Sequence, residues 1–124
     1  MLMECVRQIL RSRLSIGLFL IAAILLPNTS LAQPSVGDIL EWLDDQGSDI
    51  AAKTYIAAIE HGLSWANAHN ADNGLPMLYC LPPNLGLTGD QTVSIFVRYA
   101  EDNSVAEYPV GLVLMEALKE VFPC

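Results

Sequence analysis

Basic residues are scarce in this chain of 124 residues, which has 6 Lys and Arg against 14 Asp and Glu. Binding to nucleic acid requires Lys and Arg to neutralise phosphates, and attraction to anionic lipid requires them as well. The composition therefore argues against both kinds of ligand. A basic protein partner would be attracted to such a surface, although acidity also serves simply to keep a small exported protein soluble.

Groups suited to catalysis are also few. The chain has 2 histidines, His61 and His69, and they are too far apart in sequence to place two metal ligands on one helical face. His69 and Asp72 lack a third ligand at a suitable spacing, and the sequence contains no Gly-rich phosphate loop or nucleophile-elbow motif. We expect no catalytic site, no metal and no cofactor, and we rank an uncharacterised enzyme last among the functions considered.

The first 32 residues have the layout of a secretory signal peptide. Three arginines precede a 13-residue, almost wholly apolar run, Leu14–Leu26, which is shorter than the roughly 20 residues that a membrane-spanning helix needs. Small residues at Ser30 and Ala32 fit a signal-peptidase site, so we predict cleavage after Ala32 and export to the periplasm. Residues 33–124 should then form a single domain, free of the membrane, with 13 acidic and 3 basic side chains.

Cysteine is rare, with 3 in the chain. Cys5 precedes the apolar run and should leave with the signal peptide. Cys80 and Cys124 remain, and a cysteine at the end of the chain has little purpose unless it is bonded. We therefore predict a Cys80–Cys124 disulfide, which forms in an oxidising compartment and fixes the C-terminal segment to the middle of the fold.

Four segments of residues 33–124 show helical periodicity, and none shows a convincing strand alternation. Each begins at a residue that caps a helix or suits its first turn. The four begin at Ser35, with Asp38 in a capping box; at Ser48 or Asp49, ending near Ala68; at Thr88, with Gln91 in a capping box; and at Pro109. We predict an all-α protein, a small compact antiparallel helical bundle of about four helices stapled by one disulfide.

The stretch from Asn67 to Gly86 is predicted to be irregular because it is rich in Asn, Gly and Pro. So long a loop in a small domain is usually functional or tied down. We predict that Trp65 anchors this loop. The small residues Ala58 and Gly62 would let another helix approach closely, and we favour an internal helix contact over a dimer seam.

An ordered set of residues resembles the Rap/Tai immunity family. The resemblance covers about Ile50 to Cys124, most of the predicted mature chain. The matching residues are Tyr55, Gly62, Cys80, Pro82, Thr88, Gln91, Tyr99, Phe122, Pro123 and Cys124.

The resemblance implies a small periplasmic helical protein that binds and inhibits a peptidoglycan amidase delivered by type VI secretion. Helical proteins of this family can act as dimers, which makes a homodimer a further option. Because the matching residues are mostly architectural, we expect partner specificity to lie in a surface loop and predict that residues 67–78 protrude as the contact segment. The contact candidates are Asn70, Asp72, Asn73, Leu75 and Met77.

A rival interpretation is a small periplasmic acid-stress or chaperone-like protein. Its carboxylates would become protonated below about pH 5, and the protein would then expose apolar surface to clients. Suppression of client aggregation in acid alone would favour this function, whereas a tight complex with one amidase would favour immunity.

Overall fold

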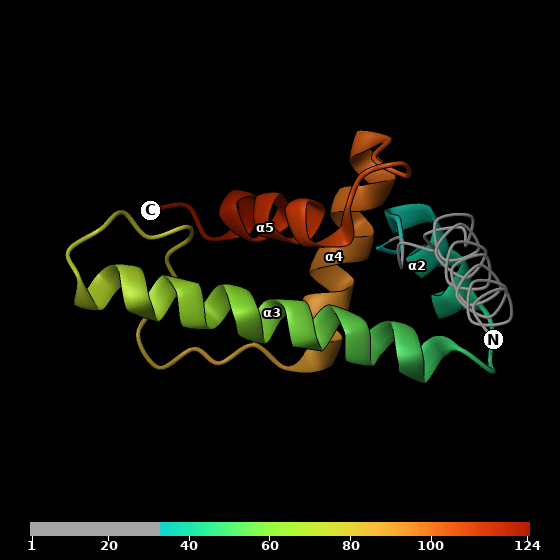
Figure 1. The fold of residues 1–124 in the computed structure, drawn as a ribbon, viewed down its shortest axis with the longest axis horizontal. Coiled ribbons are helices and arrows are strands. Elements are labelled where there is room, and N and C mark those ends of the chain that lie inside the picture. Colours follow the sequence, from blue (N-terminus) through green and yellow to red (C-terminus); the bar gives the residue numbers. More distant parts are fainter. Residues whose placement is uncertain (1–32) are drawn as a thin grey trace, which may run out of the picture. The chain divides into compact units, whose positions relative to one another are not determined.

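Residues 33–124, the part of the chain that the computed structural model describes, fold into four helices without a strand. The predicted signal peptide, residues 1–32, lies outside the described residues. The helices are α2 (Val36–Asp44), α3 (Asp49–Asp72), α4 (Gly89–Asn103) and α5 (Val110–Val121) (Figure 1). The predicted all-α class, the number of helices and the Cys80–Cys124 disulfide are thereby confirmed.

Two helices begin with the capping boxes that the sequence predicts. At α2, the Asp38 amide donates to Ser35 Oγ (3.2 Å), and the Ser35 amide donates to Asp38 Oδ2 (2.8 Å). At α4, the Gln91 amide donates to Thr88 Oγ1 (3.3 Å), and the Thr88 amide donates to Gln91 Oε1 (2.9 Å). Each box satisfies backbone amides that have no partner within the helix. Pro109 immediately precedes α5 as its N-cap residue.

The helices do not simply alternate up and down. Helices α3 and α5 contact each other and run in the same direction, and α4 crosses both of them (Figure 1). Helix α2 packs near the N-terminal end of α3 and also contacts α5. The chain reaches α4 from the far end of α3 through a long connection, residues 73–88.

The core is centred on α5. This helix of 12 residues contributes five buried side chains, whereas α3 contributes only Ala52 and Ile56 along its 24 residues. Further along α3, Ile59 and Leu63 are partly buried against the core. The C-terminal half of α3 is therefore covered on one side only. The α3–α4 connection begins where this half ends, at one end of the domain (Figure 1). The buried apolar residues are Val36, Ile39, Ala52, Ile56, Tyr79, Phe96, Ala100, Val110, Val113, Leu114, Ala117 and Leu118.

Candidate functional site

The predicted contact segment is partly helical. Helix α3 continues to Asp72, past the predicted end at Ala68, so Asn70 and Asp72 lie in its last turn and not in a loop. The extra turn is closed by the Leu75 amide, which donates to the Asn70 carbonyl (2.8 Å). Gly74 adopts φ 66°, a left-handed conformation that glycine reaches without a steric cost and that commonly follows a helix end.

Amide side chains of α3 hold the connection in place. Asn67 Oδ1 accepts from the Leu78 amide (2.6 Å), and Asn67 Nδ2 donates to the Tyr79 carbonyl (2.6 Å). Nearer the helix end, half-buried Asn70 donates through Nδ2 to the Pro76 carbonyl (2.9 Å). Asn70 is therefore a positioning residue more than a contact residue. Sequence reasoning missed the role of Asn67, whose side chain binds the two backbone groups that flank the peptide bond between Leu78 and Tyr79.

We call residues 70–77 the tip. Its apolar side chains point outward, since Leu75 is 51% and Met77 42% exposed. Asp72 and Asn73 are exposed beside them. The structure thus brings the predicted contact candidates together at the end of α3, as a hydrogen-bonded turn that presents two apolar side chains and one carboxylate.

The outer face of α3 differs from two predictions. Trp65 is 77% exposed, so the prediction that it anchors the loop is wrong. A Cβ atom added to Gly62 would meet nothing within 4 Å, and Ala58 is exposed, so the predicted internal helix contact is also wrong. The three residues lie at helical spacing on the side of α3 away from the core, which no other helix covers within residues 33–124.

Behind the tip, the connection is tied to the C-terminal segment. The Cys80–Cys124 disulfide links them covalently, and the Cys80 amide donates to the Phe122 carbonyl (2.8 Å). Tyr79 is 1% exposed between these attachments. Burial, aided by the negative charge of Glu60, raises the pKa of Tyr79.

Four further family-motif residues lie outside the tip. Tyr55 and Tyr99 are partly buried against the core. Pro82 and Pro123 are exposed close to the two disulfide cysteines in sequence.

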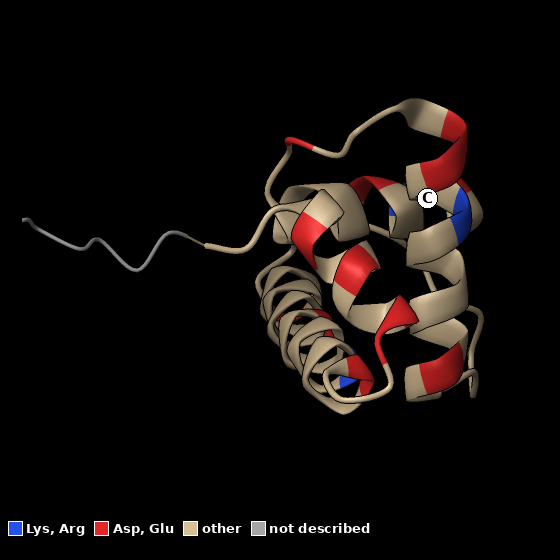
Figure 2. Cartoon of the chain, turned by 90° about the vertical axis from the view of Figure 1, so that its right-hand side faces the viewer, with Lys and Arg blue, Asp and Glu red and all other residues tan. Residues whose placement is uncertain are grey.

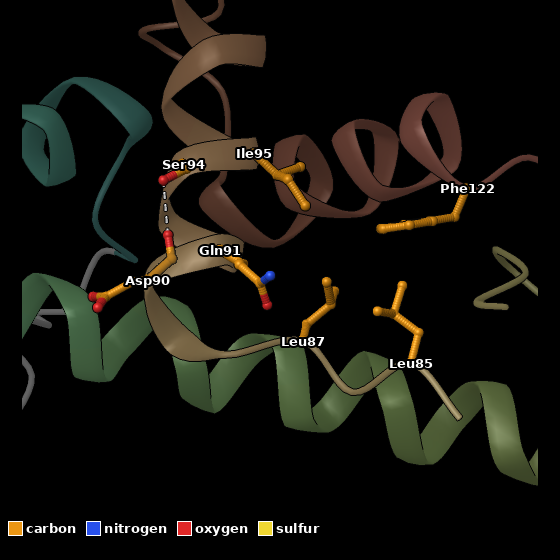
Figure 3. Close-up of a pocket in the computed structure, with 7 residues that line it drawn as sticks. All are labelled: Leu85, Leu87, Asp90, Gln91, Ser94, Ile95 and Phe122. Atoms are coloured by element: carbon orange, nitrogen blue, oxygen red, sulfur yellow. Dashed lines mark hydrogen bonds between the residues drawn. The ribbon is translucent and has the colours of Figure 1, made fainter. Parts of the chain in front are cut away.

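An apolar groove lies between α4, the end of the connection and the C-terminal segment. Leu85, Leu87, Ile95 and Phe122 converge on one space (Figure 3). The volume of this space is about 380 Å³. Within residues 33–124, Asp90 is the only ionisable residue that lines it, so this part of the chain places no paired acid and base in the groove.

The histidines and acidic residues do not assemble a reactive centre. His61 is 75% exposed at the side chain, and its Nε2 lies 3.9 Å from Glu60 Oε2. Within residues 33–124, no three His, Cys, Asp or Glu side chains are grouped as metal ligands. In the same part of the chain, no helix combines the length and the apolar character needed to cross a bilayer.

Negative charge dominates the described surface. Two of the basic residues pair within their own helices, Lys53 with Asp49 (3.2 Å) and Lys119 with Glu116 (2.9 Å). Figure 2 shows acidic residues along α2 and around the α4–α5 connection, with few basic residues among them.

The fold is that of a small helical protein closed by a disulfide. The family model of the Rap1a immunity proteins matches residues 37–124, and the chain belongs to this family. The resemblance noted in the sequence is thereby confirmed. Membership indicates that this is an immunity protein against a type VI secretion effector. Such a protein binds the effector as a protein partner and acts as an inhibitor rather than an enzyme. No match was found among curated proteins or among solved structures.

Proposed function

We propose that this immunity protein acts in the periplasm and inhibits a peptidoglycan amidase effector by placing the tip in or over the enzyme's catalytic cleft. The family supports inhibition of an effector, and the signal-peptide layout of residues 1–32 supports export. The observation that carries the choice of surface is the tip itself, a projecting turn whose apolar side chains are held outward by hydrogen bonds to its own backbone.

The hydrogen bonds of the tip matter because ordering a flexible loop costs free energy when it binds. The bonds from Asn67 and Asn70 fix the connection before any partner arrives, so less conformational entropy is lost on association. Leu75 and Met77 can then fill an apolar part of a cleft, while the Asp72 carboxylate lies beside them. A protruding anchor surrounded by polar groups is the usual composition of an interface centre.

The test begins with a pull-down of the exported protein against competitor secretions, followed by inhibition assays with the amidase recovered. The variant Leu75→Ser/Met77→Ser should weaken inhibition about 30-fold, because truncating anchors at an interface centre costs about 2 kcal/mol or more. Ile50→Ser provides the matched control, since Ile50 is 74% exposed in the first turn of α3, at the opposite end from the tip. The control should change inhibition less than threefold.

Both variants should retain the melting temperature of the unsubstituted protein because the substituted side chains are exposed. Full inhibition by the double variant would exclude the tip as the contact surface. Recovery of an effector that is not an amidase would overturn the assignment of the target while leaving the immunity class intact.

A further inference from the structure

A second groove, which shares no residue with the tip, lies where α4, α5 and their connection meet. It encloses about 140 Å³. Val113 in this groove is buried, whereas Tyr108 is 53% and Leu112 is 44% exposed. Tyr99, Val105 and Glu116 complete the lining, and we call these six residues the acidic groove.

The acidic groove is held in shape by hydrogen bonds to α2. The Tyr108 carbonyl accepts from the Val36 amide (3.0 Å), and the Ala106 carbonyl accepts from the Gly37 amide (2.9 Å). These bonds join the start of α2 to the α4–α5 connection and fix the backbone that carries the Tyr108 ring. A ligand in the groove would therefore not have to order this segment when it binds.

Acidic residues outnumber basic ones around the groove, where Arg98 precedes the lining residue Tyr99 and Lys119 pairs with Glu116. From Tyr99 to Glu116 the chain carries no Lys or Arg. Figure 2 shows that acidic residues also predominate on neighbouring α2. The acidic residues of the 99–116 segment are Glu101, Asp102, Glu107 and Glu116.

Glu116 already receives one cation. Lys119 Nζ lies 2.9 Å from Glu116 Oε1 and 3.1 Å from its Oε2, and both side chains are partly exposed to solvent. An exposed pair of this kind contributes little net stability, so another cation can replace Lys119 at low cost. The pair shows that both carboxylate oxygens can be reached from solvent.

We propose that the acidic groove binds an arginine side chain of a basic segment in a protein partner. The aliphatic stem of arginine suits the apolar wall at Leu112, the Tyr108 ring offers a face for the cation, and the planar guanidinium can donate to both oxygens of Glu116. Phosphate-rich ligands would be repelled by the surrounding carboxylates. The proposal does not depend on the identity of the effector or on the role of the tip.

The experiment titrates the protein, purified from the periplasm with its disulfide intact and labelled with ¹⁵N, with the peptide acetyl-Gly-Leu-Arg-Leu-Gly-amide. A second titration uses the same peptide with citrulline in place of arginine, which keeps the shape and removes the charge. We expect chemical-shift changes centred on the acidic groove, and an affinity for the citrulline peptide at least fivefold lower. Equal affinities for the two peptides, or shifts spread over all acidic segments, would overturn the proposal.

Two variants separate the groove from general electrostatic attraction. Glu116→Gln should weaken the arginine peptide at least fivefold, whereas Glu120→Gln, an equal charge change at an exposed position of the same helix, should weaken it less than twofold. Tyr108→Leu keeps an apolar side chain and removes the ring, and should weaken binding about threefold. Equal losses in Glu116→Gln and Glu120→Gln would reduce the effect to net charge and refute an arginine site.

Discussion

Removal of the Cys80–Cys124 disulfide is expected to lower the free energy of unfolding by about 4 kcal/mol. The bond closes a segment of 44 residues that includes α4 and α5. In the chain-entropy description, a cross-link over a loop of this length removes about 13 cal/mol/K from the unfolded ensemble, which gives this value at room temperature. A loss of this size compares with a total stability of roughly 5–15 kcal/mol for a small domain.

The assay is urea denaturation of the oxidised protein and of the double variant Cys80→Ser/Cys124→Ser, which leaves neither bridge thiol free. In thermal denaturation of the same two proteins, the melting temperature of the variant should be lower by about 15–30 °C, because 1 kcal/mol corresponds to about 4–8 °C in a domain of this size. Reduction of the unsubstituted protein should reproduce the loss of the double variant. If the oxidised protein and the variant differed by less than about 1 kcal/mol, the bond would not restrict the unfolded chain as reasoned.

Two further predictions concern side chains that bond to backbone. Asn67→Ala should lower the free energy of unfolding, measured by urea denaturation, by about 1–3 kcal/mol because two partly buried backbone groups lose their partners. The control Asn103→Ala, whose amide bonds an exposed carbonyl of its own helix, should lower it by less than about 0.5 kcal/mol. Similar losses in the two variants would contradict the role of Asn67 in holding the connection. Hydrogen bonds from the Ser35 amide and hydroxyl lower the pKa of Asp38 from its ordinary 3.8, so its contribution to stability is present above that pH and is lost as pH falls through the folded-state pKa. Asp38→Asn should therefore flatten the pH dependence of unfolding in this acidic range, and an unchanged profile would refute the assignment.

The starts of the helices were predictable because their determinants are local. The Ser35 and Thr88 caps each bond a residue three positions ahead, and such a box is visible in the sequence. The end of α3 was not, since it depends on bonds between Asn70 and residues 75 and 76, which lie beyond the helix. A propensity scale treats Asn70 as a weak helix former and does not record that its amide is occupied by the connection.

The two surfaces were predictable to different degrees. The tip lies within one continuous polar segment, so length and composition pointed to it. The exposure of Trp65 depends on where neighbouring helices end, which its own sequence context does not state. The acidic groove combines Tyr99 with Leu112 and Glu116, which come together only after the chain turns between α4 and α5.

The bonds from the start of α2 to the α4–α5 connection have a consequence for secretion. The amides of Val36 and Gly37 find their carbonyl partners near residue 107, and Cys80 finds its partner at Cys124. Pairing between such distant segments is slow because the intervening chain must first be ordered. Under the proposed export, a polypeptide that crosses the membrane N-terminus first cannot close its core on the far side before the α5 segment follows.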